Sequence, residues 1–323
     1  MQSIRNIIII GAGPVGLACA IQAAQKGLSC LVLEKGVLVN SIYKGPTHGT
    51  FFSTARQLEI GNVPFVSQFP KPTRQEICHY YRRVAEHHDL NIRFHTPVNA
   101  LEDMGASFRI GLDDQDLYSK SVIVATGFYD QPNMLGIKGE NLPHVSHYYK
   151  EAHMYFGQNV VVVGGRNSAI EAALEIFRAG GHVSLVHKDA SFSNKVKYWL
   201  LPDIENRIKE GSIRAYFETR VVRISEKTVT LKTGTRLFEI ENDAVLAMTG
   251  YHPNQDLLQQ AGVNIDPETL VPEHDPDSLE TNVKGLYVAG SPVAGRDCNK
   301  IFIENGRLHA KPIIDSIVTN LGE

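Results

Sequence analysis

Two short glycine runs have the spacing that binds a dinucleotide. The first, GAGPVG, follows the apolar residues 7–10 and fits the pattern GxGxxG. Glycines at these positions permit a tight turn, and the N-terminus of the following helix then faces a pyrophosphate. Glu34 follows 18 residues after Gly16 at the end of the next apolar segment, where a carboxylate accepts hydrogen bonds from ribose hydroxyls. The residues that we expect to bind this dinucleotide are Gly11, Gly13, Pro14, Gly16, Glu34 and Lys35. The alternative is an ordinary tight turn.

The second run, GGRNSA at 164–169, departs from that pattern. Gly164 and Gly165 are present, but Arg166 stands where the middle glycine belongs, and Ala169 takes the last place. A helix that follows this run would again present its N-terminus to a phosphate group. Without a second observation, the run also fits a purely structural strand–helix–strand unit.

The segment after the second run favours a phosphorylated ribose. It ends in VHKD, where His187 and Lys188 offer positive or hydrogen-bonding groups, and Lys195 and Lys197 follow. These groups suit a 2′-phosphate, so the sequence favours NADPH over NADH. The alternative is that the lysines belong to a solvated loop.

The four cysteines form neither a disulfide framework nor a zinc-binding pattern. Cys19, Cys30 and Cys78 fall in apolar segments and are expected to pack in the interior. Cys298 lies in GRDCNK, before a predicted final helix, and neighbouring cations would lower its pKa. It is the candidate catalytic thiol, and the alternative is a loop cysteine without a function. The histidines show no HxH or HExxH spacing, so no metal site is predicted.

The elements around these residues repeat. Residues 4–36 and 158–189 each indicate strand, glycine turn, helix and strand, and residues 94–124 and 214–248 each indicate short strands. The order predicts an α/β protein with two Rossmann-like dinucleotide-binding domains of the three-layer ββα type. We expect one domain at 1–128 and 249–323, with the second inserted at 129–248.

Two dinucleotides in one chain suggest FAD in the first domain and NADPH in the second, with hydride passing from nicotinamide to flavin. A final helix starting near Ile301 would direct its positive end at the flavin pyrimidine.

The 323 residues are 43% hydrophobic with a net charge of −3. No long basic run, signal peptide or membrane-spanning run is evident, so we expect a cytoplasmic protein without nucleic-acid or membrane partners.

Longer phrases carry a family resemblance. SIYKGPTHGTFFS, ATGFY, GGRNSAIEAALE, AMTGYHPN and IFIENGRLHA resemble the thioredoxin-reductase-like flavoproteins and, more narrowly, the bacillithiol disulfide reductases, over nearly the whole chain. The resemblance implies NADPH-driven reduction of an oxidised low-molecular-weight thiol, alongside a small redox protein partner, in a homodimer or higher oligomer. It implies that the flavin is lined by Pro46, Thr47, His48, Thr126, Gly127, Gly290 and Ser291. It also implies that Asn167 and Ser168 begin the helix that binds NADPH.

Three departures narrow what the resemblance implies. Residues 129–248 hold no cysteine, so the CxxC dithiol of thioredoxin reductase is absent. Ser291 stands where that relative has Asp, and Val15 stands where typical bacillithiol disulfide reductases have a cysteine. A valine has no nucleophile, so the electron acceptor stays open. A ferredoxin or flavodoxin reductase, a flavin monooxygenase and a non-catalytic redox sensor are the alternatives.

Overall fold

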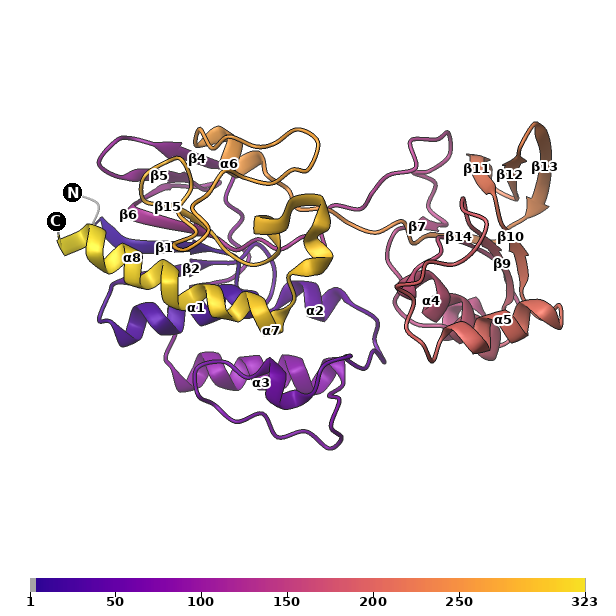
Figure 1. Ribbon diagram of the computed structural model, residues 1–323, viewed down its shortest axis with the longest axis horizontal. Helices are drawn as coiled ribbons and strands as arrows, with labels where there is room; N and C mark the ends of the chain where they lie inside the picture. The colour runs from indigo at the N-terminus through magenta and orange to yellow at the C-terminus, as the bar shows by residue number, and fades with distance from the viewer. Residues whose placement is uncertain (1–3, 323) are drawn as a thin grey trace. The chain divides into compact units, whose positions relative to one another are not determined.

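The computed structural model describes residues 4–322, which divide into two compact units (Figure 1). Unit 1 runs from the first described residue to Lys44 and continues over Gly49–Gln131 and from Tyr251 onward. Unit 2 comprises Pro132–Gly250 together with the short segment Gly45–His48. The sequence places no boundary at Gly45, because nothing in the composition there resembles a linker.

Unit 1 is built on a seven-stranded sheet with the order β3-β2-β1-β6-β5-β4, in which β15 also pairs with β6. The strands are β1 (Arg5–Ile10), β2 (Cys30–Leu33), β3 (Ile92–Arg93), β4 (Ala100–Asp103), β5 (Phe108–Gly111), β6 (Asp116–Val124) and β15 (Leu286–Val288). The helices are α1 (Pro14–Gln25), α2 (Asn40–Lys44), α3 (Arg74–His87), α6 (Asp256–Gln260), α7 (Ile303–Gly306) and α8 (Ala310–Gly322).

Strand β1 forms the centre of this sheet because both of its faces are apolar. It pairs in parallel with β2 and β6, and its four isoleucines are at most 5% exposed. Ile7 and Ile9 pack with α1, α3 and α8, whereas Ile8 and Ile10 pack with the cluster that includes β4, β5 and α6. A central parallel strand covered on both sides requires such a continuous apolar run.

Unit 2 repeats this design with an all-parallel sheet of the order β10-β9-β8-β14-β7. These strands are β7 (Val145–Ser146), β8 (Asn159–Val163), β9 (His182–Val186), β10 (Arg214–Tyr216) and β14 (Ala244–Ala247). Helices α4 (Asn167–Arg178) and α5 (Leu201–Lys209) contribute to the core on one face. The antiparallel strands β11 (Thr219–Ile224), β12 (Thr228–Thr233) and β13 (Arg236–Glu241) supply the core on the other.

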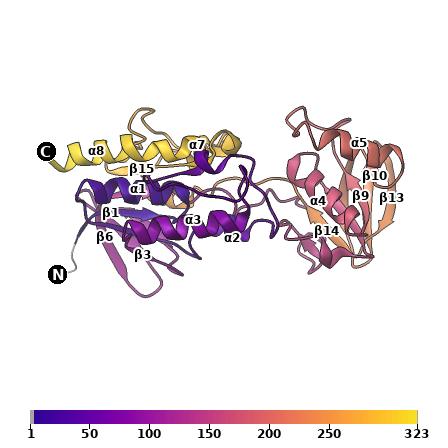
Figure 2. The ribbon, with the colours of Figure 1, turned by 90° about the horizontal axis from the view of Figure 1, so that it is seen from below.

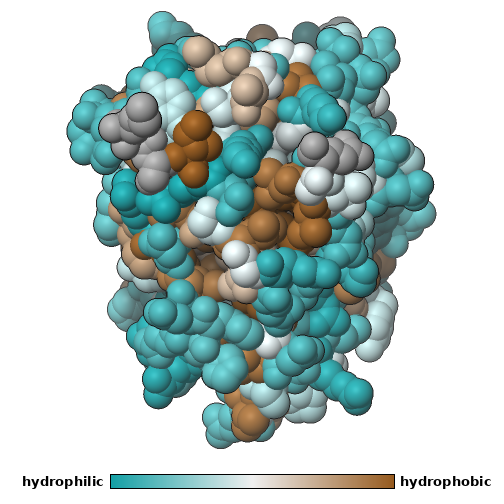
Figure 3. All heavy atoms as spheres, turned by 90° about the vertical axis from the view of Figure 1, so that its left-hand side faces the viewer, coloured by the Kyte–Doolittle hydropathy of each residue, from teal (hydrophilic) through white to brown (hydrophobic). Residues whose placement is uncertain are grey.

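Each unit therefore has helices, a parallel sheet and antiparallel strands as successive layers (Figures 1 and 2). The predicted fold class is confirmed. In both units the glycine turn follows a parallel strand and leads directly into a helix, β1 into α1 and β8 into α4. The end of unit 1 that carries the chain termini shows an apolar area among hydrophilic side chains (Figure 3).

The predicted helix from Ile301 begins two residues later, at Ile303, and contains a 3-10 turn. A 3-10 helix, η3 (Ser291–Lys300), precedes an extended Ile301, and the short α7 is joined to α8 by the 3-10 turn η4 (Arg307–His309). The side chain of Asn305 accepts from the Phe302 N–H at 2.8 Å and donates to the Lys300 carbonyl at 2.8 Å. These local side-chain bonds start a new turn at Phe302, which hydrophobic periodicity does not reveal.

Candidate functional site

The first glycine turn is shaped by two close backbone approaches. Gly11 has a φ of +109°, and a Cβ there would lie 2.5 Å from the Ala125 carbonyl oxygen. A Cβ at Gly16 would lie 2.0 Å from the Gly11 carbonyl oxygen. At Gly13, a Cβ would meet no atom of the described residues within 4 Å. The turn is thus closed toward the sheet and open at Gly13, just before Pro14 begins α1, where a helix N-terminus binds a phosphate.

Glu34 connects this turn to the end of β2. Its side chain is 6% exposed, and its carboxylate accepts from the Ala12 N–H at 2.9 Å and the Gly36 N–H at 2.8 Å. The next residue, Lys35, directs its Nζ to Asp130 at 2.8 Å. The acid predicted to bind a ribose therefore lies beside the turn, fixed by two backbone donors.

Thr126 provides a test of whether a ligand fits here. Its hydroxyl is buried and has no hydrogen-bond partner among residues 4–322. Gly127 follows with a φ of +71°, and a Cβ there would meet nothing within 4 Å in the described chain. A buried hydroxyl without a partner is costly unless another group completes its hydrogen bond. The residues of this region therefore fit a bound group such as a flavin.

Val15 contacts two other segments of unit 1. A Cβ at Gly290 would lie 3.4 to 3.5 Å from the side-chain carbons of Val15. A Cβ at Gly306 would lie 3.0 Å from the Val15 Cγ2 and 3.2 Å from the Ile301 Cγ2. The valine thus fills the space between the first turn, the end of β15 and α7. The missing thiol is replaced by a close apolar contact, not by another polar group.

Gly290 is held by a histidine that the sequence analysis did not single out. Its backbone N–H donates to the His309 Nδ1 at 3.1 Å, and Gly290 has a φ of +71°. The neighbouring Ser291 donates from its hydroxyl to the Ile301 carbonyl at 3.4 Å. His309 lies 19 residues from Gly290 and has no recognisable motif spacing, so only the fold reveals this contact.

Pro46, Thr47 and His48, expected at the flavin, belong to unit 2. The Thr47 N–H donates to the Lys150 carbonyl at 2.8 Å, and the His48 Nε2 lies 3.7 Å from the Glu151 carboxylate. His48 is 82% exposed at its side chain. These contacts fix the segment on residues 150–151, which no local signal in the sequence indicates.

The second glycine turn packs against different groups from those at the first turn. Gly164 has a φ of +144°, and a Cβ there would lie 2.6 Å from the Met248 carbonyl oxygen. A Cβ at Gly165 would lie 2.2 Å from the His187 ring, so the ring rests directly on this glycine. Arg166 immediately precedes α4 and is exposed, as is Ser168. The turn therefore presents cationic and polar groups at the helix N-terminus, which suits an anionic ligand.

The structure favours one of the two roles expected of His187. Burial lowers the pKa of its imidazole, with the nearby Lys188 also lowering it and Asp189 opposing the shift. A lowered pKa keeps the ring neutral at physiological pH, so His187 offers hydrogen bonding and not positive charge. The exposed Lys188 and Lys195 supply cations, whereas Lys197 lies 2.6 Å from Glu171. The Asn167 Oδ1 accepts from the Lys197 N–H at 2.8 Å and braces the same loop.

The reactivity expected of Cys298 is also corrected. Its thiol is 5% exposed and donates to the Tyr251 carbonyl at 3.6 Å. Burial raises its pKa, and the Asp297 charge adds to this effect. Lys300 lies 2.6 Å from Asp297, and Arg296 donates to the Glu268 carbonyl, so neither cation is directed at the thiol. The expected activation of Cys298 is therefore wrong, because the cations pair elsewhere and the thiol is desolvated.

The other three cysteines are also poor nucleophiles. Burial raises the pKa of Cys19, which is fully buried. Burial also raises the pKa of Cys30, to about 12. The pKa of the half-buried Cys78 is raised for the same reason. All four cysteines are free. Low thiolate content at neutral pH makes each of them a weak attacking group.

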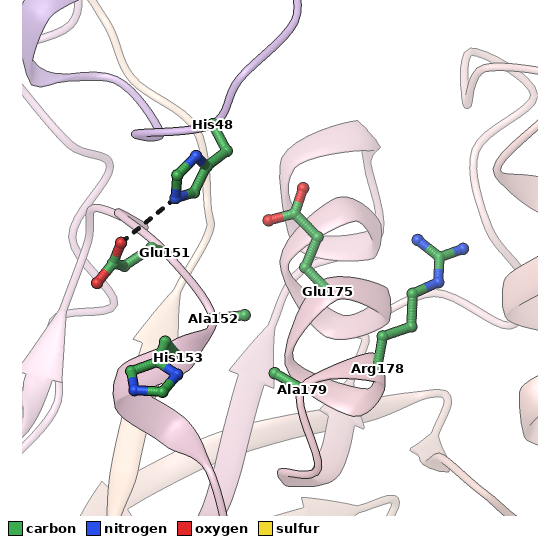
Figure 4. A pocket seen from close by; sticks show the side chains of 7 residues that line it. All are labelled: His48, Glu151, Ala152, His153, Glu175, Arg178 and Ala179. Carbon is green, nitrogen blue, oxygen red and sulfur yellow. Dashed lines mark ion pairs between the residues drawn. The ribbon is translucent and has the colours of Figure 1, made fainter.

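An open cavity lies in unit 2 beside the end of α4, away from the glycine turn (Figure 4). Its lining residues are His48, Glu151, Ala152, His153, Glu175, Arg178 and Ala179. Several of its charged groups are already paired within the protein: Glu151 with His48, Glu175 with Tyr149 at 2.6 Å, and Arg178 with Asp203. The cavity therefore has few free polar groups for a ligand.

Within residues 4–322, no group of three or more His, Cys, Asp or Glu side chains is arranged to hold a metal ion. No helix in the same range has both the length and the apolar character needed to cross a membrane.

Comparison with known proteins gives matches over nearly the whole chain. Bacilliredoxin reductase Bdr of Bacillus subtilis (strain 168) is 43% identical over 315 residues, which is 97% of this chain and 97% of that protein. The solved bacillithiol disulfide reductase Bdr of Bacillus cereus superposes with a TM-score of 0.96 at 40% identity, over 98% of this chain and 100% of that one. The Staphylococcus aureus protein of the same name gives 0.94 at 40% identity, over 99% of each chain. A ferredoxin–NADP reductase of Ignicoccus hospitalis is 24% identical over 293 residues, 88% of this chain and 89% of that protein.

A family model described as pyridine nucleotide-disulphide oxidoreductase matches residues 8–290, a span that includes both glycine turns. The chain is accordingly an oxidoreductase that uses FAD and NADPH. It belongs to the pyridine nucleotide-disulphide oxidoreductase family.

Proposed function

We propose that this enzyme oxidises NADPH and reduces a low-molecular-weight disulfide of the bacillithiol disulfide class. The observation that carries the proposal is the similarity, over 97% of both chains, to a protein named bacilliredoxin reductase. Two solved proteins named bacillithiol disulfide reductase, each 40% identical, support it. In the overall reaction, NADPH and one proton reduce one disulfide to two thiols, and NADP⁺ is released.

We assign FAD to unit 1. The open N-terminus of α1 at Gly13 and Pro14 would bind the pyrophosphate, and Glu34 would accept from the ribose hydroxyls. The unsatisfied Thr126 hydroxyl would complete its hydrogen bond to the cofactor, with the open Gly127 beside it. Ser291 is expected to contribute from the end of β15. When bound, FAD accepts a hydride and passes its two electrons to the disulfide.

We assign NADPH to unit 2. The N-terminus of α4 and the exposed Arg166 would neutralise the pyrophosphate, and Ser168 lies in the first turn of this helix. Lys188 is the exposed cation nearest in sequence to the end of β9 and is expected to bind the 2′-phosphate. The neutral His187 would donate or accept a hydrogen bond there.

The acceptor step is expected to proceed without a protein thiol. Val15 stands in the first turn, and burial raises the pKa of each of the four cysteines. A thiol held protonated attacks a disulfide poorly, which favours direct reduction of the small disulfide by the reduced cofactor.

An anaerobic titration with NADPH, followed by an acceptor series, tests this function. NADPH is expected to bleach the flavin absorbance, and bacillithiol disulfide is expected to restore it faster than cystine, ferredoxin or a quinone. Tight binding of both nucleotides without bleaching would indicate a non-catalytic redox sensor. Bleaching with fast reoxidation by ferredoxin alone would overturn the proposed substrate class.

A ferredoxin reductase is the second candidate function. The absence of an activated cysteine among the described residues favours it, because transfer to an iron–sulfur protein needs no thiol. The relative of that name in Ignicoccus hospitalis is 24% identical over 293 residues, so it supports this function less than the 43% identical relative supports the first.

The assembly and location follow as further proposals. We expect a homodimer or higher oligomer in the cytoplasm, acting on a small disulfide or on a small redox protein that carries it. Light scattering of the FAD-loaded protein tests the oligomer, and a monomer at micromolar concentration would contradict it.

A further inference from the structure

Gly290 occupies a backbone conformation that other residues rarely adopt. Its φ is +71° and its ψ is −147°, at the end of β15. The preceding Ala289 is fixed to the sheet, because its N–H donates to the Val124 carbonyl at 2.9 Å. An unusual backbone conformation persists only where the surroundings hold it. Two contacts hold Gly290 in this conformation. One is made to its N–H, and the other lies on the side where another residue would carry its Cβ.

The N–H contact determines the protonation state of His309. The Gly290 N–H donates to the His309 Nδ1 at 3.1 Å, so Nδ1 is the acceptor nitrogen. A histidine ring that accepts at Nδ1 is neutral and carries its proton on Nε2. Protonation at Nδ1 would place two donors against each other and remove the bond.

The second contact connects Gly290 to the first glycine turn. The Val15 side chain lies 3.4 Å from the position of a Gly290 Cβ and 3.0 Å from that of a Gly306 Cβ. Gly306 belongs to α7, three residues before His309. A shift of Gly290 would therefore alter both the end of β15 and the turn assigned to the pyrophosphate.

The charges around His309 leave its neutral form favoured. Burial is the main cause that lowers its pKa, and the facing His274 adds to it. The turn η4 packs on α1, α7 and α8, and α1 has no charged residue. The charged side chains on the other elements are Glu304, Arg307, Lys311 and Asp315, of which Lys311 pairs with Asp315 at 2.5 Å and Arg307 donates to the Glu59 and Glu304 carbonyls.

We propose that His309 is a positioning residue that holds Gly290 for flavin binding, and that acid releases the flavin by breaking this bond. The proposal rests on the assignment of FAD to unit 1. Above the ordinary histidine pKa of about 6.5 the ring is neutral and the bond is intact. Because the pKa in the folded protein is lower, the bond is lost only as the pH falls below that value.

The FAD dissociation constant, measured by flavin fluorescence between pH 8 and pH 5, tests the proposal. In the wild type, affinity is expected to be constant at neutral pH and to fall about tenfold in acid, the loss expected for one buried hydrogen bond. His309→Asn keeps an acceptor oxygen that does not titrate, so its affinity is expected to stay flat. His309→Leu removes the acceptor and is expected to bind FAD weakly at every pH.

Two further variants make the result specific. His79→Asn changes an exposed histidine on α3 and is expected to keep the wild-type profile. His274→Asn removes the ring that helps to lower the pKa of His309 and is expected to move the acid midpoint to higher pH, which tests the proposal even if His309→Asn does not fold.

Three outcomes would overturn the proposal. An acid loss in His309→Asn equal to that of the wild type excludes His309 as its cause. If the wild type binds FAD at pH 8 and loses no affinity in acid, the positioning role of His309 is contradicted, whereas the assignment of FAD to unit 1 is not. A wild type that binds no FAD at pH 8 contradicts both this proposal and the assignment of FAD to unit 1.

Discussion

Val15 occupies a position where one atom type decides the chemistry. Its two methyl groups fill the space against Gly290 and Gly306, so the turn is closely packed at this point without a sulfur atom. Cysteine is smaller than valine, and a thiol here would lie at the same contact. The residue therefore changes the reactivity of the turn with little change in its packing.

Alkylation of a Val15→Cys variant tests this view. Wild-type disulfide turnover is expected to survive iodoacetamide, because its four cysteines have raised pKa values. The disulfide turnover of the variant is expected to fall about tenfold after treatment, since the modified side chain blocks the turn. Val15→Ser, which cannot be alkylated in this way, is the control. Loss of wild-type turnover under the same conditions would indicate a reactive native cysteine.

Cys298→Ser is expected to leave turnover within about twofold of the wild type, because burial raises the pKa of this thiol and it binds a backbone carbonyl. Steady-state rates with NADPH and the small disulfide give the comparison. A loss of more than tenfold, with the flavin content unchanged, would restore Cys298 as a catalytic residue.

At the scale of elements, α3 begins with a complete capping box. The Thr73 hydroxyl accepts from the Glu76 N–H at 3.3 Å, and the Glu76 carboxylate accepts from the Thr73 N–H at 2.8 Å. Glu76 also accepts from the Gln68 N–H, and these bonds lower its pKa. The motif ties the loop before α3 to the helix that packs under β1.

Thr73→Ala is expected to lower the free energy of unfolding by about 1 kcal/mol, the usual value of an N-cap. Urea denaturation at pH 7 measures the loss, with Gln75→Ala on the exposed face of α3 as the control. Because the pKa of Glu76 is lowered in the folded protein, its contribution is present above about pH 4.5 and decreases as the pH falls further. A Gln75→Ala loss as large as that of Thr73→Ala would contradict the capping role.

The elements at the chain's end show which local details periodicity does not reveal. Residues 301–318 have an apolar pattern that predicts one helix, and the chain forms α7, η4 and α8 as one unbroken helical run with a 3-10 turn inside it. The Asn305 side chain and the contact of Gly306 with Val15 determine where these segments begin and turn. Both involve neighbours outside the apolar pattern.

At the scale of the whole molecule, two units share the same design but differ beside their glycine turns. Each has a glycine turn after a parallel strand and a helix that starts beyond it, but the residue at the end of the next strand differs. In unit 1 Glu34 accepts from Ala12, whereas in unit 2 the His187 ring covers Gly165. The difference supports different nucleotides in the two units.

Hydrogen exchange on the intact chain tests this division. FAD is expected to slow exchange at residues 11–16 and 126–127 of unit 1, and NADP⁺ at residues 164–169 of unit 2. At one hundred times its dissociation constant, each ligand adds about 2.7 kcal/mol to the stability of the part that binds it. Protection of residues 11–16 by NADP⁺ alone would reverse the assignment.

Several features could be predicted because they depend on local pattern. The buried strands around Ile7 and Val162, the two glycine turns and the small-residue helices follow from apolar runs and from glycine geometry. The burial of Cys19 follows from its place on the inner face of α1. The lowered pKa of Cys298 was predicted wrongly, and the choice between charge and hydrogen bonding at His187 stayed open, because both depend on desolvation by neighbours distant in sequence.

The sequence by itself determined the fold class, the two glycine turns and the absence of a thiol at Val15, since these depend on residue identity at short spacing. Only the tertiary structure decided that His309 holds Gly290, that Gly45–His48 belongs to unit 2 and that Cys298 is desolvated. These contacts join segments 19 to more than 100 residues apart, where hydrogen-bond geometry and burial arise only once the chain has folded.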